Sequence, residues 1–112
     1  MTTESAASEG IDLDALGRIG FALASDTRRR ILVALIDGGV HPAQLAEQLD
    51  TSRTNVSNHL ACLRGCGLVT ATPHGRRMRY QLADPRLREA LRQLSNLVAL
   101  PDPLHPHMST EN

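Results

Sequence analysis

The chain has 112 residues and a formal net charge of zero, which suits one small domain and argues against a uniformly basic nucleic-acid-binding protein. Phe21 and Tyr80 are its only aromatic residues, so aliphatic side chains must form the core, and dimerisation is a common way to stabilise so small a domain. No run of about 18 apolar residues occurs, so we expect no membrane partner. Residues 1–9 lack the apolar region of a signal peptide, so we expect a cytoplasmic location, where thiols stay reduced.

Two helices are predicted near the start of the chain. Residues 1–9 are small, polar and acidic, and we expect them to be disordered. Apolar residues at helical spacing then predict a first helix over residues 11–23. A capping position at Ser25 or Asp26 begins a second helix, which ends at the glycine pair 38–39.

A helix-turn-helix and a β-hairpin are predicted next. A proline in its first turn begins a short third helix over residues 42–49. A polar turn at 50–52 leads to a fourth helix over 53–66, with apolar residues on one stripe. Strands over 68–72 and 77–82 then surround four residues with turn chemistry, which indicates a hairpin.

The last predicted helix begins at the Asp84–Pro85 capping pair and runs to about residue 100. Three prolines then forbid further helix, so residues 101–112 are expected to form a flexible tail. The order α-α-α-α-β-β-α is mainly α with a small β-hairpin. It predicts a winged helix-turn-helix over residues 10–100, serving both DNA binding and dimerisation.

The fourth predicted helix and the hairpin carry the features of a DNA-binding surface. Residues 51–83 contain five arginines and no aspartate or glutamate, so positive charge is concentrated there. A recognition helix needs short hydrogen-bonding side chains in its first turns to reach base edges, and a wing needs arginines to contact phosphates or the minor groove. The alternative, that these polar residues are simply solvated, leaves the coincidence of the three features unexplained. The predicted DNA-binding residues are Arg53, Thr54, Asn55, Ser57, Asn58, His59, Arg64, Arg76, Arg77 and Arg79.

Cys62 and Cys66 are the only cysteines and stand four residues apart on the fourth predicted helix. This spacing places both sulfurs on one face, one turn apart, where they can chelate one ion without bending the backbone. Thiolates prefer Zn, Cd, Pb or Cu(I) to hard cations. Two ligands do not complete a site, and the tail offers His105 and His107 as further donors. From the residues alone, a cysteine pair can equally be a small apolar filler. The remaining histidines at 41 and 74 are expected to be solvated loop residues.

Three segments, residues 23–32, 51–69 and 75–82, resemble the ArsR/SmtB family of metalloregulatory repressors. The run Cys-Leu-Arg-Gly-Cys at 62–66 resembles the signature of its cadmium- and lead-sensing members. The resemblance implies a homodimer that represses by binding an inverted-repeat operator without metal and is released by metal. It also implies that the first and last helices form the dimer interface, where the candidate residues are Leu13, Leu16, Leu87, Leu91, Leu94 and Val98.

The resemblance further implies a third metal ligand from the tail. The family pattern has a cysteine there, and an ungapped alignment places His107 at that position, with His105 nearby. A site with an imidazole in place of one thiolate can still bind Cd(II) or Pb(II), but its metal preference moves towards Zn(II). The other metal sites of the family lack their residues: the third predicted helix has no Cys-x-Cys, and the last predicted helix has no suitable His or Glu pair.

The sequence therefore predicts a metal-responsive transcriptional repressor whose inducer is a thiophilic divalent ion. One alternative keeps the winged fold and makes the cysteines a thiol-redox switch. A second alternative is a small thiol-dependent or metal-carrying enzyme. No Ser-His-Asp, paired-carboxylate or glycine-rich phosphate pattern supports catalysis, and we do not expect an enzyme.

Overall fold

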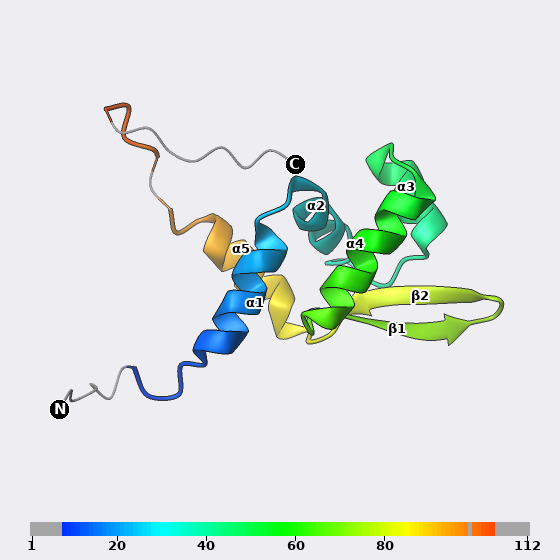
Figure 1. The fold of residues 1–112 in the computed structure, drawn as a ribbon, viewed down its shortest axis with the longest axis horizontal. Helices are drawn as coiled ribbons and strands as arrows, with labels where there is room; N and C mark the ends of the chain where they lie inside the picture. Colours follow the sequence, from blue (N-terminus) through cyan, green and yellow to red (C-terminus); the bar gives the residue numbers. More distant parts are fainter. Residues whose placement is uncertain (1–7, 99, 105–112) are drawn as a thin grey trace.

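The structure is a computed structural model that describes residues 8–98 and 100–104 of the chain. Its elements are α1 (Leu13–Leu23), α2 (Asp26–Ala34), α3 (Pro42–Leu49), α4 (Arg53–Gly65), β1 (Val69–His74), β2 (Arg77–Leu82) and α5 (Arg86–Ser95) (Figure 1). This order confirms the predicted α-α-α-α-β-β-α arrangement. The expectations for residues 1–9 and for the tail mostly concern positions outside the described residues.

Aliphatic side chains from α2, α3 and α4 form the core, as the composition predicts. On α4 the buried residues recur at helical spacing, so one face packs inward and the opposite polar face remains in solvent. The large aliphatic residues among those that are at most 1% exposed are Ile31, Leu32, Leu35, Leu45, Val56, Leu60 and Leu63.

Hydroxyl or carboxylate side chains cap the starts of α1, α2 and α4. Asp12 accepts a hydrogen bond from the backbone N–H of Ala15 at the start of α1, 3.1 Å away. Of the two candidates for the cap of α2, Ser25 is the one that forms it, because its Oγ accepts from the N–H of Arg28 at 3.3 Å. These caps satisfy N–H groups that have no partner within the helix.

The hairpin is longer and its tip tighter than predicted. β1 and β2 pair in antiparallel register up to His74 opposite Arg77, which leaves Gly75 and Arg76 as a two-residue loop. Gly75 has φ of +67°, a conformation that favours glycine in such loops. The hairpin projects from the helical body (Figure 1), so its tip is free to contact a partner.

The last helix is shorter than predicted. α5 ends at Ser95 rather than near residue 100. The side chains of Ser95 and Asn96 both donate to the carbonyl oxygen of Arg92, at 2.7 and 3.1 Å. Such side chains compete with the helical backbone and favour termination. Among the described residues, no helix has the length and hydrophobicity needed to cross a bilayer.

Candidate nucleic-acid interface and metal centre

The turn between α3 and α4 fixes where α4 begins. Asp50 adopts the left-handed conformation with φ of 54°, and the N–H of Thr51 donates to the carbonyl of Ala46 at 3.0 Å. Ser52 then caps α4, because its Oγ accepts from the N–H of Asn55 at 3.0 Å. The side-chain amide of Asn55 donates to the Thr51 hydroxyl at 3.0 Å. Asn55, one of the predicted DNA-binding residues, therefore also stabilises the turn.

The first two turns of α4 present a polar, solvent-exposed face. Val56 and Leu60 are fully buried on the opposite side and hold the helix against the core. A helix held in this way can insert its exposed face into a major groove. The predicted DNA-binding residues on this exposed face are Arg53, Thr54, Ser57 and Asn58.

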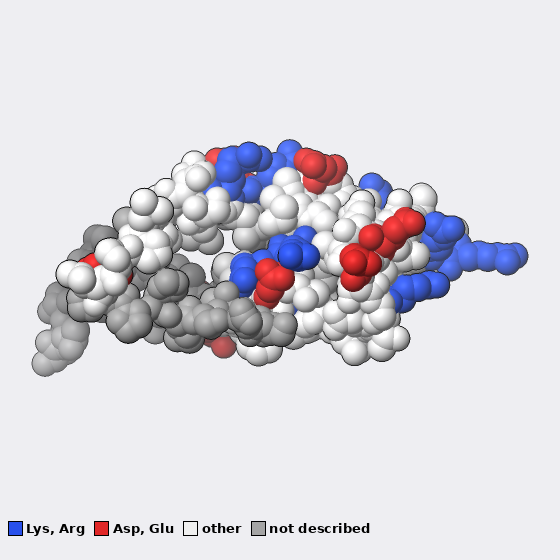
Figure 2. Space-filling model, turned by 90° about the horizontal axis from the view of Figure 1, so that it is seen from above, with Lys and Arg blue, Asp and Glu red and all other residues white. Residues whose placement is uncertain are grey.

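The hairpin carries exposed arginines at its tip. Arg76 and Arg77 are both exposed, and neither forms an ion pair with another described residue. Figure 2 shows basic side chains gathered at the end of the molecule where the hairpin projects. Such unpaired guanidinium groups suit phosphate contacts.

Two contacts tie the hairpin to the segment that leads into α3. Val40 and Tyr80 exchange both backbone hydrogen bonds, each 2.9 Å long. His41 lies against the hairpin, with its Nδ1 3.1 Å from the carbonyl oxygen of Met78 and its ring stacked on that of His74 at 5.3 Å between centroids. The expectation that both histidines are solvated loop residues is therefore wrong: His41 is half-buried, and His74 is exposed but is the last residue of strand β1. The contacts of the His41 ring with the hairpin could not be predicted from the sequence, because Met78 and His74 lie more than 30 residues away.

Three further predicted DNA contacts are neither on the exposed face of the first two turns of α4 nor at the tip of the hairpin. His59 is half-buried, and burial together with the positive charge of Arg28 lowers its pKa. Arg64 is exposed in the last turn of α4, at the end opposite the cap. The side chain of Arg79, on β2, lies across Gly39, so closely that a Cβ atom at that position would clash with it. Their contact with DNA stays a prediction.

Cys62 and Cys66 lie next to each other at the C-terminal end of α4. Both are free and half-buried, and each is close enough to the other for Cys62 to affect the pKa of Cys66. Burial raises the pKa of the Cys66 thiol, and the neighbouring Cys62 adds to this effect, whereas the positive charges of Arg28 and Arg18 act in the opposite sense. A thiophilic cation would favour both thiolates at once, so the pair fits such an ion.

The pair has no third ligand within the described part of the chain. No group of three or more His, Cys, Asp or Glu side chains there has the geometry to hold a metal ion. The tail candidates His105 and His107 lie outside the described residues, so their role stays a prediction.

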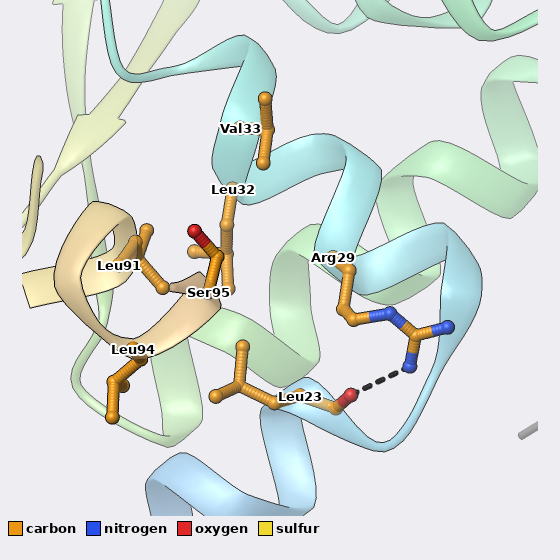
Figure 3. Close-up of a pocket in the computed structure, with 7 residues that line it drawn as sticks. All are labelled: Leu23, Arg29, Leu32, Val33, Leu91, Leu94 and Ser95. Atoms are coloured by element: carbon orange, nitrogen blue, oxygen red, sulfur yellow. Dashed lines mark hydrogen bonds between the residues drawn. The ribbon is translucent and has the colours of Figure 1, made fainter. Parts of the chain in front are cut away.

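Apolar side chains of α1 and α5 are exposed where the dimer interface is predicted. Leu91 and Leu87 are half-buried and pack against the chain's own core. A 260 Å³ cavity lies between the end of α1, α2 and α5, and Leu23, Leu91 and Leu94 are among the residues that line it (Figure 3). The predicted interface residues that remain exposed are Leu13, Leu16, Leu94 and Val98.

Comparison with known proteins gives the family. A family model described as bacterial regulatory protein, arsR family, matches residues 25–71. The chain is 58% identical over 92 residues to the HTH-type transcriptional regulator CmtR of Mycobacterium tuberculosis, which covers 82% of this chain and 78% of that protein. It is 38% identical over 74 residues to a probable mercury resistance operon repressor of Streptomyces lividans, covering 66% and 59%.

Solved structures agree with the sequence comparison. The NMR structure of the cadmium metal-sensor CmtR from Mycobacterium tuberculosis matches with a TM-score of 0.65 and 55% identity, covering 83% of this chain and 97% of that one. The homodimeric winged helix-turn-helix DNA-binding domain Mb0332 from Mycobacterium bovis matches with a TM-score of 0.68 and 29% identity, covering 86% and 91%. These relatives are transcriptional regulators, which confirms the expectation of a regulator rather than an enzyme. The chain therefore belongs to the ArsR family of bacterial regulatory proteins and has their winged helix-turn-helix fold.

Proposed function

We propose that the protein is a homodimeric repressor that binds operator DNA without metal and releases it when Cys62 and Cys66 bind a thiophilic divalent ion. Cd(II) and Pb(II) are the proposed inducers, with Zn(II) as a further candidate. The observation that carries the proposal is the position of the two adjacent free thiols. They lie at the end of the same helix whose first turns present side chains suited to base contacts.

The DNA-binding half of the proposal depends on the spacing of two identical surfaces. A dimer through α1 and α5 would present two α4 helices to successive major grooves, about 34 Å apart. The exposed apolar residues of α1 and α5 support this assembly, because they are the kind of surface that a partner covers. The homodimeric relative of the same fold supports it as well. An inverted-repeat operator would match the two-fold symmetry of such a dimer.

The metal-binding half of the proposal depends on a donor from the tail. A bound divalent ion would hold both sulfurs as thiolates, and a site of two thiolates and an imidazole accepts Cd(II), Pb(II) and Zn(II). His107 is the preferred third donor, because it falls at the position of the tail cysteine in the family pattern, and His105 is the second choice. The similarity to a cadmium sensor supports the choice of ion.

Helix α4 would connect metal binding to DNA binding. Cys62 and Cys66 lie at the end of α4, the helix that Ser52 caps at its start. A metal ion bound by the two thiols and by a tail residue would pull this end of α4 towards the tail. The whole helix would then turn relative to the major groove of the DNA. Allosteric couplings of this kind typically amount to about 1–3 kcal/mol. DNA affinity is then expected to fall between fivefold and about 150-fold on metal binding.

The test combines metal binding and DNA binding on the same samples. Thiolate-to-metal absorption is titrated with Cd(II), Pb(II) and Zn(II), and fluorescence anisotropy measures binding to a labelled duplex with the inverted repeat upstream of the protein's gene. Cys62→Ser should bind this duplex but ignore metal, and His107→Ala should weaken metal binding with little change in metal-free DNA affinity. A Cys62→Ser variant that is still fully released by metal would overturn the site.

Treatment with peroxide distinguishes metal sensing from the alternative function, thiol-redox sensing. Treatment of the metal-free protein with peroxide should leave DNA binding largely intact, because burial raises the pKa of Cys66 and a redox-sensing thiol depends on ready ionisation. Release by peroxide together with indifference to Cd(II) would instead assign the pair to redox sensing.

A further inference from the structure

The half of the hairpin that carries the tip arginines extends beyond the core. β1 begins at Val69, which is only 3% exposed, whereas residues 72–79 are all exposed. Arg76 and Arg77 belong to this exposed half. A two-stranded hairpin alone is marginally stable in water. Contacts with the rest of the protein are therefore needed to fix where the two guanidinium groups lie relative to α4.

The outer edge of β2 offers backbone groups for such contacts. In an antiparallel pair, residues that bond across the pair alternate with residues whose N–H and C=O face outward. Tyr80 faces outward, because both of its backbone groups bond to Val40 at 2.9 Å. Met78 is two residues nearer the tip and so faces the same way. Its partner across the hairpin, Pro73, has no N–H to give, so the Met78 carbonyl is open to a donor from the helical body.

His41 supplies this donor, directly after the backbone pair that Val40 forms. Its Nδ1 lies 3.1 Å from the Met78 carbonyl oxygen. Because a carbonyl only accepts, Nδ1 carries the hydrogen. The ring also stacks on His74, with 5.3 Å between centroids and 27° between the planes. His74 is the last residue of β1, next to the tip loop. His41 therefore contacts both strands immediately below the arginines.

His41 is itself held by the helix-turn-helix. It is the N-cap residue of α3, and its backbone N–H donates to the side chain of Gln44 in the first turn at 2.9 Å. Leu45 and Ala46 anchor α3 in the core, where the helix packs against α4. A continuous series of contacts thus runs from α4 through α3 and His41 to the hairpin tip.

We infer that His41 is a positioning residue for DNA binding, which holds the hairpin where Arg76 and Arg77 reach the DNA while α4 occupies the major groove. The inference rests on the DNA-binding half of the proposed function and does not involve the metal site. Without the His41 ring, the hairpin would keep its own pairing and its bridge to Val40. Its tip would then move relative to α4, and the arginines would contact phosphates for a smaller fraction of the time.

Substitutions of the two histidines separate the hydrogen bond from the stacking. His41→Ala removes both contacts. His41→Asn keeps a short N–H donor and is a favoured N-cap residue, but it lacks the ring. His41→Phe keeps a ring and lacks the donor. His74→Ala also removes the stacking and keeps the donor, so its effect should match that of His41→Asn.

The experiment measures the binding of the full-length, metal-free protein to the labelled operator duplex at several salt concentrations. The four tip arginines of a dimer contribute about 0.9 each to the slope of log affinity against log salt concentration. In His41→Ala we expect this slope to become shallower by at least about 1.8, and the affinity at low salt to fall at least about fivefold. His41→Asn and His41→Phe should each retain more of the slope than His41→Ala.

The matched control repeats His41→Ala in a protein that already carries Arg76→Gln and Arg77→Gln. With no tip arginine left to position, His41→Ala should change operator affinity by less than about twofold in this background. A defect of folding would instead weaken binding equally in both backgrounds. Urea unfolding of each variant gives the fraction of folded protein, by which the affinities are corrected.

The outcomes that would overturn the inference differ from those that would overturn the proposed function. A wild-type salt slope in His41→Ala, together with a shallower slope in the tip double variant, would overturn the inference alone. Equal loss of affinity in both backgrounds would overturn it too, because His41 would then act independently of the arginines. A wild-type protein that does not bind the operator duplex would overturn the proposed function itself.

Discussion

The arginines at the hairpin tip give the DNA-binding proposal a quantitative test. Arg76→Gln combined with Arg77→Gln removes two exposed guanidinium groups from each subunit, neither of which is ion-paired within the described chain. If each contacts one phosphate, a dimer loses four such contacts. Each phosphate contact contributes about 0.9 to the slope of log affinity against log salt concentration, so the slope should become shallower by about 3.6. Arg76→Gln alone should account for about 1.8.

Fluorescence anisotropy with an operator duplex, between about 50 and 200 mM salt, measures this slope. The control removes the same charge from α5 through Arg86→Gln and Arg92→Gln. These two arginines pair with Asp84 at 2.7 Å and with Glu89 at 3.6 Å, so the slope should hardly change. An equal change of slope in the two double variants would refute the assignment of the hairpin as a wing, because net charge alone would then explain it.

Two further predictions concern the helix that carries the recognition face and the start of α5. Ser52→Ala removes the cap that accepts from the N–H of Asn55. It should lower the free energy of unfolding in urea by about 1 kcal/mol and weaken operator binding, whereas Ser52→Asp should retain most of both. Hydrogen bonds from the Arg86 side chain lower the pKa of Asp84 from 3.8 to about 2. Its small contribution to stability is therefore present above pH 3.8 and lost as the pH falls towards 2. Asp84→Asn should lack this loss in acid unfolding curves, and an unchanged curve would contradict the role of the pair.

The sequence predicted the parts of the fold that depend on local patterns. Helix caps, glycine stops and apolar periodicity gave the order of elements, and α4 has the predicted buried stripe. The errors occur where side chains compete with the backbone or where a turn has two solutions. α5 stops at Ser95 because its last side chains bond to the Arg92 carbonyl, although the apolar spacing continues beyond it. The hairpin closes at Gly75 because a two-residue loop lets His74 pair with Arg77.

The candidate site could be predicted only in part, because much of it depends on long-range contacts. The spacing of Cys62 and Cys66 was enough to place both thiols on one helical face. The contact of His41 with the hairpin and the bonds from Arg28 to α1 join residues that no local pattern connects. Arg28 and Arg29 lie within a run of three arginines, and only the packing of α1 against α2 shows that these two donate to carbonyls at the end of α1.

The central claim is that metal bound at Cys62 and Cys66 opposes operator binding, and linkage gives it a direct test. The affinity for Cd(II) is measured for the free protein and for the protein saturated with operator duplex, with the buffer held constant. Because coupling between two sites is reciprocal, the operator complex should bind Cd(II) more weakly by the same factor by which Cd(II) weakens DNA binding. Equal cadmium affinity in the free and DNA-bound protein would contradict the account.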